Sequence, residues 1–313
     1  MRGGIPVNST MPSKSTYAKV LGEANQDPNI RRHLYPKIEK QLGEHKRLVS
    51  FFTTFQWPVQ LDDRDADMLE EVFQNCCQAG SKELVLLLNC PGGDALAAER
   101  IVNICRSYSK GNKFSVIVPK MAKSAATMVC LGAQDIGMSR TSELGPIDPQ
   151  IRVSEGVYYA AHEIIESYNE LMKKASATKG KVEPFLQQLY RFDATQIRWI
   201  KSAQQLSESI AVNVLKTGVM QGKAEKEIKK KIQPFLSPEF SKVHGRPIYP
   251  DVVQKCGLNV TIYELDTPLW KDIWELYVRC NYMVSTFNTG VAKLIESETE
   301  HFFSPNPLAR ASS

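Results

Sequence analysis

The sequence lacks an apolar run of the length that a membrane-spanning helix needs, which is about 18 residues or more. Residues 1–20 are polar and rich in proline and serine, and they contain no apolar segment of the kind found in secretory signal peptides. We therefore expect a cytoplasmic protein with no membrane association.

Cysteine patterns that would hold a metal ion or a set of disulfides are also missing. The seven cysteines include one adjacent pair, Cys76 and Cys77, but no CxxC spacing and no Cys/His ligand pattern. Cys90, Cys105 and Cys130 lie inside apolar runs, which is typical of buried, reduced thiols. These absences argue against a zinc site and a disulfide framework, and we expect a reducing environment, no metal ion and no cofactor.

Charge of one sign is nowhere concentrated, although the formal net charge is +5. The densest basic segment, "KAEKEIKKKIQ" at 223–233, has interleaved acidic residues, which is typical of a solvated helix face. We therefore expect no nucleic-acid partner. Hydrophobic residues make up 42% of the chain and charged residues 23%, the balance of a globular protein, and no internal repeat is present.

What the sequence does contain is an alternation of short apolar runs and helical patterns. The run "ELVLLLN" at 83–89 is apolar on both faces, as a central strand of a parallel sheet must be. The alternation predicts βαβ units and an α/β fold. Further strands are expected at 47–55, 113–119 and 135–139, and helices at about 30–45, 61–80, 94–109 and 124–133.

The ends of the chain and its second half have a different character. Residues 1–30 are rich in Gly, Pro, Ser, Thr and Asn, which predicts a flexible arm. We expect a main domain over 31–265 that carries a helical insertion at about 155–235, and a C-terminal helical extension and flexible tail over 266–313. The helices expected there are 159–176, 182–190, 193–217, 222–233 and 268–298, with a short element at 248–256.

Two consecutive strand-to-helix turns carry residues suited to acyl transfer. "NCPGGDALAAE" places Gly92 and Gly93 after one strand, and "KSAAT" places Ser124 at the start of the next helix. The carboxyl ends of parallel strands share one edge of a sheet, so a hydroxyl and free backbone N–H groups meet there. Alternatively, Ser124 is only a helix N-cap and the glycines only a turn, and Asp94 is expected to be an N-cap.

These segments, together with "VIVPKMAKSAATMVCLGAQDIGMSRTSELGPIDPQI", resemble the Clp-fold serine proteinases of the serine dehydrogenase proteinase family, which are relatives of signal peptide peptidase A and of the Clp protease proteolytic subunit. The resemblance covers about 30–265. It implies a Clp/crotonase-like spiral of ββα units with a helical C-terminal region. It also implies that Ser124 matches the nucleophile and that the amides of Gly93 or Gly92 and of Ala125 match the oxyanion hole.

The general base is less clearly marked. Where the Clp subunit has a histidine, this chain has Asp148, whereas signal peptide peptidase A uses a Ser–Lys dyad. "ATKGKVEPFLQQL" at 177–189 is similar to the segment after that lysine and puts Lys179 on its position, with Lys181 two residues away. The alternative is that both are solvated loop lysines.

Other residues are weaker candidates for a role in the site. His162 and His244 are possible bases, and Asp148 either orients the base or bonds its own Pro-rich turn. Lys123 precedes Ser124, so its side chain is expected to point away from the nucleophile, as a rim or substrate contact.

The leading hypothesis is thus a serine endopeptidase that hydrolyses polypeptides through an acyl-enzyme on Ser124, with Lys179 as base. Two alternatives remain: a catalytically silent oligomeric scaffold of the same fold, and a crotonase-type enzyme that handles acyl-CoA. The lack of a paired Glu near the turns counts against acyl-CoA chemistry. The resemblance implies a homo-oligomer. Whether a regulatory partner delivers substrate to the site is left open.

Overall fold

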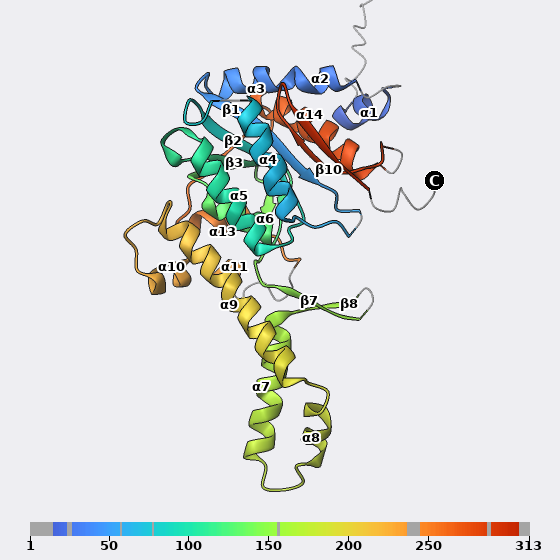
Figure 1. Cartoon of the computed structure of the whole chain (residues 1–313), viewed down its shortest axis with the longest axis vertical. Helices are drawn as coiled ribbons and strands as arrows, with labels where there is room; N and C mark the ends of the chain where they lie inside the picture. The colour runs from blue at the N-terminus through green and yellow to red at the C-terminus, as the bar shows by residue number, and fades with distance from the viewer. Residues whose placement is uncertain are drawn as a thin grey trace, which may run out of the picture.

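The structure is a computed structural model that describes residues 15–23, 27–56, 58–76, 78–154, 157–236, 245–286 and 289–306. Within these residues the central sheet has seven strands in the order β11-β10-β1-β2-β3-β5-β9 (Figure 1). The neighbours from β1 to β9 are parallel, whereas β10 and β11 add antiparallel strands beside β1. The strands are β1 (Lys46–Thr53), β2 (Glu83–Asn89), β3 (Ser115–Val118), β5 (Asp135–Met138), β9 (Val260–Ile262), β10 (Val291–Glu296) and β11 (His301–Pro305).

Helices cover both faces of this sheet because its strands are apolar on both sides. Along β2, Leu84 and Leu86 belong to one buried cluster, and Val85 and Leu87 belong to another. Successive side chains of a strand point to opposite faces, so the two clusters lie on the two faces. The first contains residues of α4 (Asp63–Cys76), α5 (Ala95–Tyr108), α6 (Ala125–Gly132) and α9 (Ala194–Lys216), and the second those of α1 (Thr16–Leu21), α3 (Leu34–Leu42) and α14 (Pro268–Ser285).

A second, smaller set of pairings lies beyond the carboxyl ends of the parallel strands. The short strands β4 (Met121–Ala122) and β6 (Glu143–Leu144) are parallel, and they are flanked by single bridges to Cys90 and Ile248. The chain therefore passes from a main-sheet strand to a short outer strand and then to a helix. This repeat confirms the predicted α/β spiral of ββα units.

The insertion is an elongated, mainly helical arm. Figure 1 shows α7 (Ala161–Ala177) and α8 (Glu183–Leu189) reaching away from the three layers, with α9 leading back to them. The arm begins with a hairpin, β7 (Gln150–Ser154) and β8 (Val157–Ala160), that the sequence pattern did not predict. Of the helices described, none combines the length and apolar composition that crossing a bilayer requires. The other short helices are α2 (Pro28–Arg32), α10 (Glu225–Lys231), α11 (Gln233–Leu236), α13 (Pro250–Lys255) and the 3-10 turn η1 (Lys110–Asn112).

The predicted C-terminal helix is wrong over its last part. It begins at Pro268 as expected, but it ends at Ser285, and residues 291–296 form β10 instead. All six residues of β10 are buried, and the strand pairs with β1. The predicted flexible tail is likewise wrong over 302–305, which belong to β11. The division of the chain into three domains stays a prediction.

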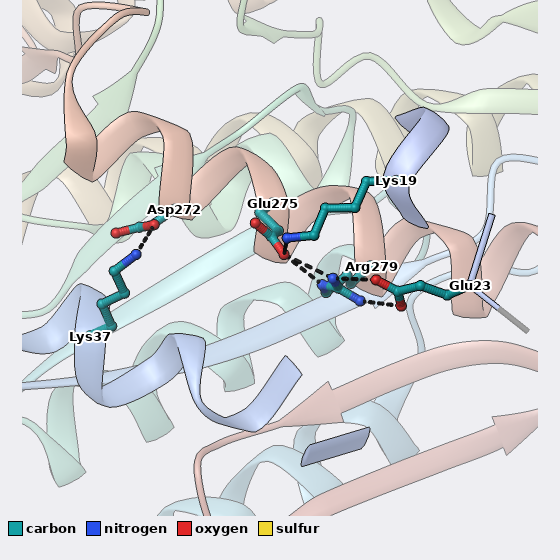
Figure 2. Close-up of polar contacts among 6 residues, drawn as sticks. All are labelled: Lys19, Glu23, Lys37, Asp272, Glu275 and Arg279. Carbon is teal, nitrogen blue, oxygen red and sulfur yellow. Dashed lines mark hydrogen bonds and ion pairs between the residues drawn. The ribbon is translucent and has the colours of Figure 1, made fainter. Parts of the chain in front are cut away.

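The described part of the predicted flexible arm is helical and docked, which corrects that expectation. Arg279 of α14 is buried and bonds both carboxylate oxygens of Glu23 at 2.8 Å (Figure 2). Glu275 accepts hydrogen bonds from Arg279 and, at 2.9 Å, from Lys19 of α1. These ion pairs, together with the buried Val20 and the contact of Tyr17 with Trp274, hold the segment on α14.

Candidate active site

Ser124 lies where the outer strand β4 meets α6. Its backbone has a φ of 50°, which non-glycine residues rarely adopt and which costs about 1–3 kcal/mol. Although Ser124 is the N-cap residue, its hydroxyl makes no capping hydrogen bond. All eight residues of α6 are buried, so the helix fixes the serine firmly. An uncommitted hydroxyl on a strained backbone at a helix start is typical of a functional position.

The glycine turn touches this helix start directly. A methyl group at Gly92 would lie 2.7 Å from Ser124 Cβ, 2.5 Å from the Lys123 carbonyl oxygen and 3.0 Å from the Ala125 nitrogen. Gly92 also has a φ of 97°, in the region that favours glycine. Only a residue without Cβ lets the two turns approach this closely, so the structure brings Ser124, Ala125 and the glycines together.

The other side of the turn is clamped by Leu61. The Leu61 N–H donates to the Gly92 carbonyl at 2.8 Å, and the Asp94 N–H donates to the Leu61 carbonyl at 2.9 Å. This is a parallel bridge centred on Gly93, so the N–H of Gly93 itself points away from Leu61. Asp94 then caps α5 by accepting from Leu96 N at 2.7 Å, as the sequence predicted.

Two amides at this junction are uncommitted. Within the described part of the chain, the N–H groups of Gly93 and Ala125 donate no hydrogen bond. The Gly92 N–H instead points toward the sulfur of Cys90, at 3.4 Å. Burial raises the pKa of the Cys90 thiol to about 12, so this sulfur stays protonated and is only a weak acceptor. Gly93 is therefore better placed than Gly92 to donate to a ligand.

Ser124 and both glycines open into a cavity of about 750 Å³. Its walls come from the turn, from α6 and from the start of the arm, and they are largely apolar. The described residues that line it include Asp94 but neither a lysine nor a histidine. Aromatic and aliphatic lining residues are Phe55, Val59, Leu96, Met128, Ile147, Ile151, Tyr158, Trp199 and Leu206.

The structure does not bring the predicted lysines to this cavity. Lys179 and Lys181 lie in the connection between α7 and α8, and both side chains are exposed. In Figure 1 this connection is at the far end of the arm from the sheet. In this conformation of a single chain, neither lysine is positioned to take a proton from Ser124.

His162 and Asp148 are brought together, as a pair. His162 Nδ1 lies 3.0 Å from Asp148 Oδ2, and the other carboxylate oxygen of Asp148 has no partner among the described residues. Burial raises the pKa of Asp148, although the hydrogen bond from His162 partly offsets this effect. His162 lines a neighbouring cavity of about 1110 Å³, not the one at Ser124. His244 lies outside the described residues.

Lys123 points away from Ser124, as expected, but it does not line the cavity. Its ammonium lies 2.5 Å from Glu143 and donates to the Leu144 carbonyl at 3.2 Å, so it supports the outer strand β6. Nothing in the described residues forms a group of three or more His, Cys, Asp or Glu arranged to hold a metal ion.

Sequence reasoning missed the wall that the arm contributes. Tyr158 and Trp199 both line the cavity and remain about half exposed, at 48% and 59%. Trp199 lies beside Ile197 and Ile200, which are buried, so the sequence pattern alone reads it as one more apolar residue of the helix. Its place in the wall of the cavity depends on how the arm folds back, which no local pattern specifies.

Comparison with known proteins now identifies the class of protein that this fold and site define. The chain matches the family of ClpP-like SDH-type serine proteinases over residues 64–281, more than half of its length, and it belongs to that family. The match contains Ser124, both glycines and the arm, and it ends before β10.

Particular relatives are similar over smaller parts. The chain is 37% identical over 91 residues to the uncharacterized protein MJ1495 of Methanocaldococcus jannaschii, which is 29% of this chain and 29% of that protein. It is 29% identical over 195 residues to the uncharacterized protein MJ0137 of the same organism, which is 62% of this chain and 57% of that protein. The chain thus spans well under two thirds of the length of either relative.

Solved structures of the 1510-N membrane-bound stomatin-specific protease are also similar. A mutant with a serine replaced by alanine is 16% identical, with a TM-score of 0.28 over 66% of this chain and 93% of that chain. A lysine-to-alanine mutant in complex with a substrate peptide is 17% identical, with a TM-score of 0.28 over 70% and 93%.

Proposed function

We propose that this chain is a serine peptidase that hydrolyses polypeptides through an acyl-enzyme on Ser124. The observation that carries the proposal is the conformation of Ser124, which is held at positive φ with its hydroxyl uncommitted beside a Gly-Gly turn. Membership of a serine proteinase family supports the same reaction class.

In the proposed reaction, Ser124 Oγ attacks a peptide carbonyl carbon while its proton passes to a base. The carbonyl oxygen becomes an oxyanion that accepts from the N–H groups of Gly93 and Ala125, with Gly92 shaping the turn. The C–N bond then breaks as the base returns the proton to the leaving amine. Water repeats the attack on the acyl-enzyme, which releases the carboxylate and regenerates Ser124.

Lys179 is the base that we propose, because its segment is similar to that of a Ser–Lys peptidase. Its exposed position at the end of the arm implies that it reaches Ser124 from a second copy of the chain or after the arm moves. A lysine accepts a proton only as a neutral amine, which burial at such a contact favours. A homo-oligomer is thus part of the proposal, as is a cytoplasmic location.

Labelling by a fluorophosphonate tests the nucleophile. This probe phosphonylates an activated serine, so the wild-type chain should be labelled and Ser124→Ala should not. Ser142→Ala is the control, since Ser142 also lies near the outer strands, but it is buried and bonds to Ser139. Labelling that persists in Ser124→Ala would reject the nucleophile.

A silent scaffold is the second candidate, and one observation favours it. The described residues that line the cavity at Ser124 include no lysine or histidine to act as base within one chain. Under this alternative the wild-type chain is not labelled at any concentration, and the arm serves only to bind partners. The Asp148–His162 pair stays a candidate: Asp148 as an orienting residue, and His162 as an orienting residue or a base.

A further inference from the structure

Lys293 is a buried charge that the proposed reaction does not use. It lies in β10, where its side chain is only 5% exposed and points to the same face as Ile295, toward α4. An apolar residue would be expected at such a position, because a buried ammonium costs free energy unless it is paired. Lys293 also lies beyond residue 281, where the family match ends.

The ammonium is paired with two carboxylates at the start of α4. Lys293 Nζ lies 2.8 Å from Asp65 Oδ2 and 2.9 Å from Asp62 Oδ2. Asp65 is fully buried, and burial raises its pKa, although Lys293 partly offsets this effect. Lys293 thus compensates a carboxylate that would otherwise be buried without a countercharge.

These two carboxylates form a capping box. Asp62 is the N-cap residue and accepts from Arg64 N at 3.1 Å, while Asp65 Oδ2 accepts from Asp62 N at 2.8 Å. The box fixes the backbone at Asp62, and the residue immediately before it is Leu61. Lys293 therefore holds the position of Leu61 through the two carboxylates.

Leu61 fixes the backbone conformation of the Gly92-Gly93 turn. Its N–H and carbonyl bond to Gly92 and Asp94 on either side of Gly93, and a methyl group on Gly93 would lie 2.2 Å from the Leu61 carbonyl oxygen. The backbones of Leu61 and Gly93 are in tight contact, so a shift of the Leu61 backbone would also shift Gly93. The direction of the Gly93 N–H depends on this chain of contacts from β10.

We propose that Lys293 is a positioning residue for the proposed oxyanion turn, acting through Asp62, Asp65 and the backbone of Leu61. The C-terminal strand is then part of the active-site framework although it contributes no group to the cavity. The proposal deepens the proposed peptidase function and rests on it for its kinetic readout, but not for its structural one.

The test compares Lys293→Met with Arg31→Met. Arg31 is equally buried and pairs with Glu296 at 2.5 Å on the same strand, but it does not contact the turn. Both variants lose a buried ion pair, so both should unfold at lower temperature. Lys293→Met alone should slow fluorophosphonate labelling at saturating probe, by about tenfold to 100-fold, with probe affinity nearly unchanged. Labelling of Lys293→Met and Arg31→Met at equal rates per folded molecule would overturn the proposal.

Amide hydrogen exchange gives a readout that needs no activity. The amides of Leu61 and Asp94 should lose about tenfold or more of their protection in Lys293→Met and keep it in Arg31→Met. Unchanged protection of both amides would overturn the positioning role. If the wild-type chain is never labelled but the amides respond, the peptidase function fails and the structural coupling stands.

A milder variant keeps the proposal testable if Lys293→Met does not fold. Asp62→Asn keeps an N-cap acceptor but weakens the link to Lys293, and Asp62 is more than half exposed, so the fold should tolerate the change. Labelling should slow by about threefold with the same loss of protection at Asp94. A normal rate and normal protection in Asp62→Asn would contradict the proposal.

Discussion

At the scale of single residues, the candidate site depends on the lack of a side chain at Gly92 as much as on the hydroxyl of Ser124. Gly92 has no side chain, so the turn lies against Ser124 and Ala125, and the strain at Ser124 is maintained by a fully buried helix behind it. Strain of this kind persists only where the surroundings over-determine the backbone. The helix and the turn together supply that constraint.

Gly92→Ala should therefore abolish function rather than merely weaken the fold. The added methyl group collides with Ser124 and the Lys123 carbonyl, so labelling by a fluorophosphonate should fall by about 100-fold or more. Gly80→Ala is the matched control, because Gly80 also has positive φ, at 73°, but has nothing within 4 Å of an added Cβ. It should lose only about 1–2 kcal/mol of stability and keep its labelling rate. Equal labelling of the two variants would show that the close approach at Gly92 is not needed.

At the scale of secondary-structure elements, α14 is the support for the N-terminal segment. Apolar residues of the two pack in one buried cluster, and ionic contacts add to this packing. Arg279 bonds Glu23 and Glu275, Lys19 bonds Glu275, and Lys37 of α3 bonds Asp272 at 2.6 Å (Figure 2). The hydrogen bond from Arg279 lowers the pKa of Glu23. Burial opposes ionisation of Glu275, but Lys19 and Arg279 outweigh it and lower its pKa.

The docking should weaken in acid. Because both carboxyl groups have pKa values below the ordinary 4.5 in the folded state, the unfolded state takes up their protons first as the pH falls. Their contribution is complete above that value and is lost below it. Arg279→Met should thus cost about 1.5–3 kcal/mol of unfolding free energy near neutral pH, and the gap from wild type should close toward about pH 3.

Chemical denaturation across this pH range measures the gap. The control is Arg140→Met, which removes an exposed pair with Glu264 and should change little at any pH. A gap between wild type and Arg279→Met that stays constant from about pH 7 to about pH 3 would show that these carboxylates do not carry the docking.

The elements also show which features the sequence could predict. Strand β2 has the predicted limits, 83–89, because it is apolar on both faces and a Pro-Gly-Gly turn follows it. Strand β10, "VAKLIE", mixes helix-forming and strand-forming residues over only six positions, and its pairing partner β1 lies far away in sequence. Local periodicity cannot distinguish the two states at that length.

Some parts of the candidate site could likewise be predicted from the sequence, and others could not. Ser124 and the glycines follow neighbouring parallel strands, so their shared edge of the sheet could be predicted from the order of elements alone. The place of Lys179 depends on the direction of the arm, and the role proposed for Lys293 depends on a strand pairing. Neither is encoded in the residues next to it.

At the scale of the whole molecule, the arm raises the question of how many chains make one site. Lys179 lies in the connection between α7 and α8, at the end of the arm away from the sheet, so mixing two inactive variants tests the proposed arrangement. If one copy supplies the lysine and another the serine, Ser124→Ala and Lys179→Ala should be inactive alone. Their mixture should recover about one quarter of the wild-type peptidase activity.

Lys181→Ala is the matched control in that mixing experiment, because it removes a neighbouring exposed lysine. It should be active alone. A mixture of Ser124→Ala and Lys179→Ala that stays inactive would place both groups in one chain, and activity of Lys179→Ala alone would reject this lysine as the base.

Strand β10 comes long after Ser124 in the sequence, and it pairs with β1, the first strand of the main sheet. During translation Ser124 and the glycine turn leave the ribosome long before β10, so on the proposal for Lys293 the growing chain carries an unsupported turn. Proteolytic competence would then arrive only after β10 has been synthesised and has paired with β1. A nascent chain that is still bound to the ribosome would then not cleave other newly made proteins.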